Sequence, residues 1–115
     1  MDEKILKWLY DIKYAIEEVD LYFDELPKDF NQYKSNRLLK RAIERNLEII
    51  GEAVNRILNQ DKNYSISYAK KIIGLRNHII HAYDNISDEY IWAIVIKHLP
   101  PLKIEIDLLI NKEEG

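Results

Sequence analysis

The chain has 115 residues, 47% of them hydrophobic and 32% charged, with a formal net charge of −3, which indicates one globular domain, residues 1–115, without a general attraction for nucleic acids. The absence of cysteine excludes disulfides and thiolate chemistry, and three glycines with three prolines leave too few turns for a many-stranded β fold. Because no apolar run reaches the ~18 residues of a membrane helix and the first residues are unlike a signal peptide, we expect a soluble, cytoplasmic protein.

Apolar residues recur at helical spacing along nearly the whole chain. The segments expected to be helical are residues 5–26, 35–58, 65–83, 87–99 and 102–110. Residues 27–34 are expected to form a connection, after which Ser35 caps the second helix. Ser87 is expected to cap the fourth helix, and Pro100–Pro101 must kink or end it. The apolar and polar residues of 102–110 alternate as in a strand, but without a partner strand we expect a short helical segment.

Four amphipathic helices with short connections predict an all-α fold, an antiparallel up-down four-helix bundle with the extra C-terminal segment. Helices this short bury little apolar surface alone. Their wide apolar faces therefore also predict a homodimer.

Two charged ladders with a four-residue spacing run along the second predicted helix. They are Arg37, Arg41 and Arg45, with Lys40 nearby, and Glu44, Glu48 and Glu52. One interpretation is a basic strip for phosphates. The other, which we favour from the sequence alone, is a solvated face of alternating ion pairs, each contributing a few tenths of a kcal/mol.

Residues 74–87, GLRNHIIHAYDNIS, concentrate polar groups at the end of the third predicted helix. At ~100° per residue, Arg76 and Tyr83 nearly eclipse, and Asn77 shares a face with His81. Arg76 and His81 diverge by about 140° on a straight helix. They could meet on one phosphate only if the helix unwinds near His81 or if two copies pool their motifs. His78 and His81 have a spacing found in metal sites, but without cysteine or an HExxH-like partner we predict no metal site.

Arginine and histidine together are sufficient for metal-free RNA cleavage. A guanidinium binds phosphate oxygens in a bidentate manner, and histidine moves protons near neutral pH. The ribose 2′-hydroxyl attacks its own phosphate while arginine stabilises the charge of the transition state. The alternative from spacing alone is that His81 and Tyr83 are packing residues and Arg76 a surface charge.

The pattern R-N-x-x-x-H-x-Y, at Arg76 to Tyr83, resembles the signature of HEPN ribonucleases, and more narrowly the R-x4-H-x-Y of HepT toxins. The resemblance extends over nearly the whole chain. Residues 41–57, including the I-G-E-A step at 50–53, are similar to the second helix of that family, and residues 91–102 to its fourth helix.

This resemblance implies a dimeric bundle of HEPN type and a metal-independent endoribonuclease that acts as the toxin of a type VII toxin–antitoxin system. Arg76 and His81 would be catalytic, and we assign Asn77 to orienting His81. A minimal nucleotidyltransferase antitoxin would transfer AMP from ATP to Tyr83, so this chain itself needs no cofactor.

Three further interpretations stay open at this point. Lys70, Lys71 and Lys97 are assigned to a local positive surface for RNA. A non-catalytic HEPN-fold module that binds RNA or a nucleotide and regulates a partner would fit the acidic net charge better. A structural adaptor, in which the motif residues pack a dimer seam, is the third alternative.

Overall fold

The computed structural model describes residues 2–67, 72–74 and 87–115, and within these ranges it contains helices and no strand. In chain order the elements are α1 (Glu3–Glu25), α2 (Phe30–Ser35), α3 (Arg37–Gln60), α5 (Asp88–Ala93), the π-helical η1 (Ile94–His98) and α6 (Leu99–Glu114). The all-α class is therefore confirmed for the described part of the chain. No helix in that part is both long enough and apolar enough to cross a membrane.

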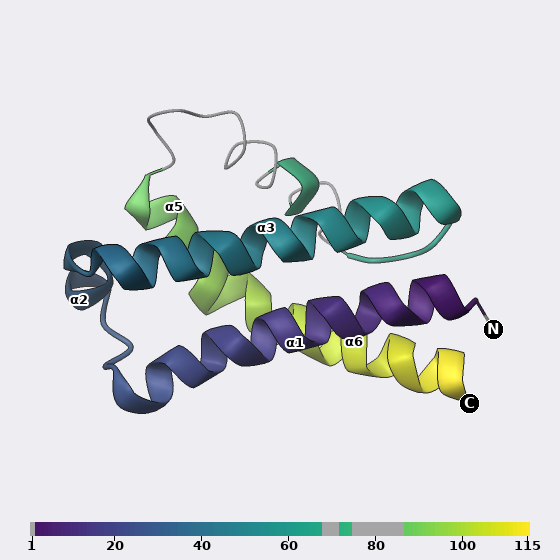
Figure 1. Ribbon diagram of the computed structural model, residues 1–115, viewed down its shortest axis with the longest axis horizontal. Helices are drawn as coiled ribbons and strands as arrows, with labels where there is room; N and C mark the ends of the chain where they lie inside the picture. The colour runs from purple at the N-terminus through teal and green to yellow at the C-terminus, as the bar shows by residue number, and fades with distance from the viewer. Residues whose placement is uncertain (1, 68–71, 75–86) are drawn as a thin grey trace.

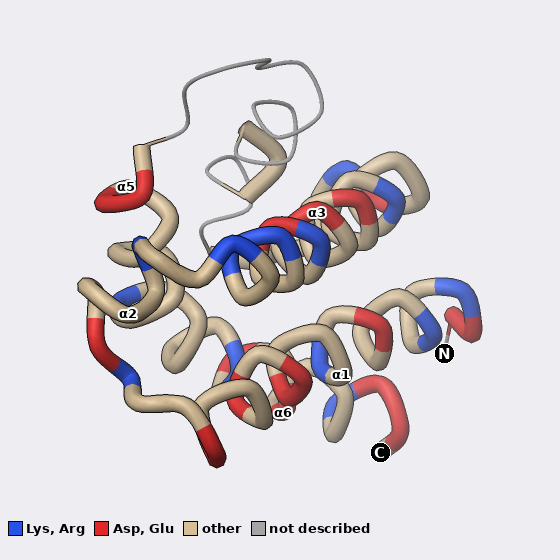
Figure 2. The backbone as a smooth tube through the Cα atoms, turned by 60° about the vertical axis from the view of Figure 1, so that its left-hand side comes forward, with Lys and Arg blue, Asp and Glu red and all other residues tan. Residues whose placement is uncertain are grey.

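The three long helices form the body of the fold (Figure 1). α1 and α3 lie side by side and run in opposite directions, and α6 packs along α1, as Figures 1 and 2 both show. Of the helix predicted over residues 65–83, residues 65–67 and 72–74 are described. Residues 72–74 are helical, whereas residues 65–67 are not, so the predicted helix start at residue 65 is wrong. The antiparallel arrangement agrees with the expected bundle, whereas the rest of the third predicted helix and the homodimer stay predictions.

The core lies where the apolar stripes of the three long helices meet. The spacing of three or four residues brings one face of each helix inward. The stripe residues of α1 and α3 include Ile5, Leu9, Ile12, Ile16, Val19, Leu39, Ile43, Leu47, Ile50, Val54 and Ile57, all buried. α6 contributes Leu102, Ile106 and Ile110. The C-terminal segment is thus a full helix with a buried face, as predicted, and not a strand.

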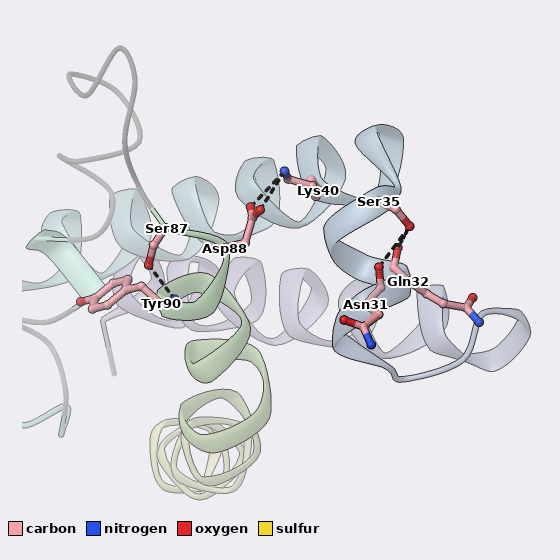
Figure 3. A network of polar contacts seen from close by, with 7 residues as sticks. All are labelled: Asn31, Gln32, Ser35, Lys40, Ser87, Asp88 and Tyr90. Atoms are coloured by element: carbon pink, nitrogen blue, oxygen red, sulfur yellow. Dashed lines mark hydrogen bonds and ion pairs between the residues drawn. The ribbon is translucent and has the colours of Figure 1, made fainter.

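The start of the second long helix differs from the prediction. Asn36, not Ser35, is its N-cap, and its Oδ1 accepts from the Leu39 backbone N–H at 3.0 Å. Ser35 is the last residue of the separate helix α2, and its hydroxyl donates to the carbonyl oxygens of Asn31 and Gln32 (Figure 3). The expected connection over 27–34 is wrong in its second half because Asp29 caps α2 through Gln32 N–H at 3.1 Å.

The fourth helix changes its hydrogen-bonding pattern before the two prolines. α5 passes into the π-helical turn η1, and α6 begins at Leu99 with Pro100 and Pro101 in its first turn. Proline has no N–H to donate, so the first turn of a helix is where it costs least. Of the two predicted alternatives at Pro100–Pro101, a kink or an end, the end is wrong: the hydrogen bonding changes from π-helical to α-helical at Leu99, and the chain stays helical through both prolines.

Candidate active site

The predicted motif residues lie outside the described part of the chain. These are Arg76, Asn77, His81 and Tyr83, together with Lys70 and Lys71. Their positions and contacts accordingly stay predictions. The structure does describe the elements that hold the chain on both sides of residues 75–86.

The chain just before the motif packs against the hydrophobic core. Ile72 is buried, and Ile73 is partly buried against the same cluster. Further back, the backbone N–H of Ser67 donates to both carboxylate oxygens of Glu105 on α6, at 2.9 and 3.1 Å. Apolar burial at Ile72 therefore anchors the chain four residues before Arg76.

The chain that follows the motif enters α5 through a capped helix start, and an ion pair attaches this helix to α3. The Ser87 hydroxyl oxygen accepts from the Tyr90 backbone N–H at 3.1 Å, which confirms the predicted cap. Lys40 Nζ lies 3.0 and 3.2 Å from the two carboxylate oxygens of Asp88 (Figure 3). The two side chains are only 29% and 23% exposed, so water screens this ion pair less than a typical surface pair.

Aromatic side chains pack beneath the start of α5. The Tyr33 ring lies 5.1 Å from the Trp92 ring, and Phe30 and Phe23 contact Trp92 at 6.2 and 5.8 Å between ring centroids. Tyr33 is fully buried, and its hydroxyl has no hydrogen-bond partner among the described residues. Burial, with smaller contributions from Asp88 and Glu44, raises the pKa of Tyr33.

Glu44 on α3 lies near the Lys40–Asp88 ion pair and interacts with both of its members. Burial raises the pKa of its carboxyl group, and nearby Asp88 acts in the same direction, although Lys40 and Arg41 oppose the change. The start of α5 therefore contacts partly buried polar side chains, which include the Lys40–Asp88 ion pair.

Lys97, the remaining predicted RNA-binding residue, is exposed on η1 and makes no ion pair with a described residue. Its proposed role stays a prediction. In the described ranges no three histidine or carboxylate side chains come together as a metal site would require.

Comparison with known proteins decides the family. The family model described as "Ribonuclease HepT-like" matches residues 12–109, a span that contains every predicted site residue. The chain belongs to the HepT-like ribonuclease family. Its matched span also includes most of α1 and all of the described α3 and α5.

Relatives of this HepT-like chain match it over nearly their full length. It is 34% identical over 104 residues to "Putative RNase MJ1380" of Methanocaldococcus jannaschii, covering 89% of this chain and 93% of the relative. It is 35% identical over 114 residues to "Putative RNase MJ0127" of the same organism, covering 94% and 88%. "Probable ribonuclease HepT" of Thermococcus cleftensis is 30% identical over 103 residues, covering 89% and 92%. No solved structure matches the chain.

The sequence did not predict the contacts among α2, α3 and α5 that lie next to Ser87. Lys40 and Asp88 are 48 residues apart, so no local pattern connects them. Tyr33 falls in the segment that was expected to be a connection. Phe30, three residues earlier, is aromatic as well and was the available local signal, whereas Trp92 joins these rings only in the structure.

Proposed function

We propose that this HepT-like chain is a metal-independent endoribonuclease and the toxin of a toxin–antitoxin pair. The observation that carries the proposal is the family match over residues 12–109, which includes the R-N-x-x-x-H-x-Y motif. The relatives are themselves named as RNases. RNA is accordingly the proposed substrate.

The proposed reaction is an internal transfer at the RNA backbone. The ribose 2′-oxygen forms a bond to the adjacent phosphorus and loses its proton, while the bond to the 5′-oxygen breaks and that oxygen gains a proton. His81 assists these proton transfers, Asn77 orients His81, and Arg76 stabilises the charge on the phosphate. The products are a 2′,3′-cyclic phosphate and a 5′-hydroxyl.

The proposed assembly is a homodimer in which both copies contribute Arg76 and His81. On a straight helix these residues diverge by about 140°. In a dimer, the motifs of two copies could together place Arg76 and His81 on one phosphate. Exposed apolar side chains on α3 and α6 are compatible with a second copy, since Leu38 is 79% and Ile104 64% exposed.

The proposed control is AMP transfer to Tyr83 by a minimal nucleotidyltransferase antitoxin that uses ATP. The modification would add bulk and an anionic phosphate seven residues from Arg76, where it would compete with the RNA backbone. Tyr83→Phe should remain an active ribonuclease that the antitoxin no longer modifies at this position. Unchanged AMP incorporation in that variant would show that Tyr83 is not the acceptor.

The deciding experiment incubates the purified protein with total cellular RNA in EDTA, beside His81→Ala. We expect cleavage by the wild type alone, with 2′,3′-cyclic phosphate ends. Equal cleavage by the variant would remove His81 from the mechanism. Intact RNA binding without cleavage, in protein whose mass shows no AMP, would favour the non-catalytic module.

A further inference from the structure

The N-terminal half of α3 carries an exposed basic surface. Arg37 and Arg41 are both exposed and, four residues apart, lie along one side of the helix. Lys34 at the end of α2 is also exposed. Figure 2 shows basic positions crowded at the end of α3 that meets α2. We call Lys34, Arg37 and Arg41 the α3 basic surface.

The acidic ladder of α3 does not neutralise this surface. Glu48 lies 4.0 Å from Arg45, and Glu52 lies 2.8 Å from Arg56. Both pairs are therefore formed further along the helix. Arg37 and Arg41 form no ion pair with any described residue. The face of alternating ion pairs favoured from the sequence thus has ion pairs within 4.0 Å between described residues only in its second half, while Glu44 in the first half interacts with Lys40 and Arg41 without such a pair.

Two described carboxylates on and beside α3, Asp88 and Glu44, form no ion pair with Arg37 or Arg41. Asp88 is bound through both of its oxygens by Lys40. Glu44, which interacts with Lys40 and Arg41, is partly buried. Three cations therefore face solvent on a chain whose net charge is −3, which is the local basic surface that an acidic protein needs in order to bind a polyanion.

The α3 basic surface lies beside the start of α5, which directly follows the residues that contain the motif. Lys40, between Arg37 and Arg41 on α3, holds Asp88, and Ser87 directly follows residues 75–86. The substrate of the proposed ribonuclease is RNA, whose backbone carries a phosphate at every nucleotide linkage. The guanidinium groups of Arg37 and Arg41 are suited to bind its phosphates in a bidentate manner.

We propose that the α3 basic surface binds the phosphate backbone of the RNA substrate beside the cleavage site. The inference rests on the proposed ribonuclease function and names a second contact region for the same substrate. Arg37 and Arg41 bind RNA and do not take part in bond breaking. Their loss should weaken binding without changing the rate at saturating RNA.

The test measures binding of a fluorescent single-stranded RNA in EDTA at salt concentrations from 50 to 200 mM, with His81→Ala as the parent so that no RNA is cleaved. Each phosphate contact contributes about 0.7 to the slope of log affinity against log salt. Adding Arg37→Gln and Arg41→Gln should therefore reduce the slope by about 1.4. The same relation predicts affinity losses of about 60-fold at 50 mM and about 10-fold at 200 mM.

Arg56→Gln in the same parent is the matched control. It removes one charge from the same helix, but that charge is already paired with Glu52 at 2.8 Å. Its slope should stay at the parental value. In the otherwise wild-type protein, the double variant should raise KM for RNA cleavage and leave kcat unchanged.

Two results would overturn the inference. If the wild type cleaves RNA and the double variant keeps the parental slope, the surface does not bind RNA, although the proposed function stands. Weakened binding of polyglutamate by that same variant would then assign the surface to an acidic protein partner. If neither cleavage nor RNA binding is found, the proposed function and the inference fail together.

Discussion

Asn46 is the polar side chain that the described core buries, with 2% of its surface exposed. Its Nδ2 donates to the Ala15 carbonyl oxygen at 3.3 Å and to Glu18 Oε1 at 3.1 Å. Its Oδ1 accepts from the Tyr22 hydroxyl at 2.7 Å. Burial, followed by the hydrogen bond to Glu18, raises the pKa of Tyr22 to about 12. This network joins α3 to α1 inside the main helix–helix contact.

Replacing Asn46 by Ala removes all three hydrogen bonds. The bond to the Glu18 carboxylate is worth about 1.5–3 kcal/mol, and the two neutral bonds about 0.5–1.5 kcal/mol each. The Tyr22 hydroxyl, whose one proton is shared between Asn46 and Glu18, then donates to Glu18 alone, at 2.9 Å, which recovers part of the loss. We therefore expect the free energy of unfolding to fall by about 3 kcal/mol. At about 4 °C per kcal/mol, Tm should fall by about 12 °C.

Urea unfolding followed by circular dichroism measures this loss, and Asn46→Asp makes the test specific. That variant keeps the shape of the side chain but places a second carboxylate beside Glu18. Like charges raise the pKa of such a pair in the folded state. Stability is then lost as the pH rises, so Asn46→Asp should be less stable than Asn46→Ala at pH 7 and should recover below about pH 5.

The control is Tyr22→Phe, which removes one hydroxyl and should cost only about 1 kcal/mol. A loss below about 1 kcal/mol for Asn46→Ala would refute the reasoning, because the three hydrogen bonds would then contribute almost nothing. Equal stability of the Asp and Ala variants at pH 7 would refute its electrostatic part.

Three further predictions concern the junction between α2, α3 and α5. Tyr33→Phe should raise the free energy of unfolding by about 1 kcal/mol, because it removes a buried hydroxyl without a partner; a loss in urea unfolding would mean that the hydroxyl is bonded after all. Burial raises the pKa of Glu44 above its ordinary 4.5, so its contribution to stability is present at low pH and is lost as pH rises through the folded-state pKa. Glu44→Gln should therefore raise Tm at pH 7, with a difference that disappears below about pH 4; an equal difference at every pH would contradict the assignment. Lys40→Glu should cost about 1 kcal/mol and slow RNA cleavage, and adding Asp88→Lys should restore both; failure of this reversed pair would show that the ion pair does not position α5.

Local signals in the sequence were sufficient to predict most helices. The stripes beginning at Ile5 and Leu39, the Ser87 cap and the helical character of residues 102–110 all agree with the structure. Each of these features depends on residues within four positions of one another, through helix periodicity or a capping hydrogen bond. The motif that pointed to the family is equally local, since Arg76 and Tyr83 are seven residues apart.

Where the prediction failed, two local signals competed. Ser35 and Asn36 are both good N-cap residues. Burial of Tyr33 favours a turn of helix before Asn36, which makes Ser35 a helix end and Asn36 the cap of α3. The placement of Arg76, Asn77, His81 and Tyr83 depends on residues outside the described ranges and stays a prediction.

Side-chain spacing and capping residues were thus enough to predict the helical class, and the motif at Arg76–Tyr83 suggested by resemblance the ribonuclease family that the comparisons show. The tertiary structure was needed for whatever joins distant parts of the chain. It pairs Lys40 with Asp88, encloses Asn46 between two helices, and leaves Arg37 and Arg41 without an ion pair to any described residue. The apolar periodicity of a helix can be recognised in the sequence of that helix alone. Which charged side chains on its surface form ion pairs depends on the other helices that pack against it.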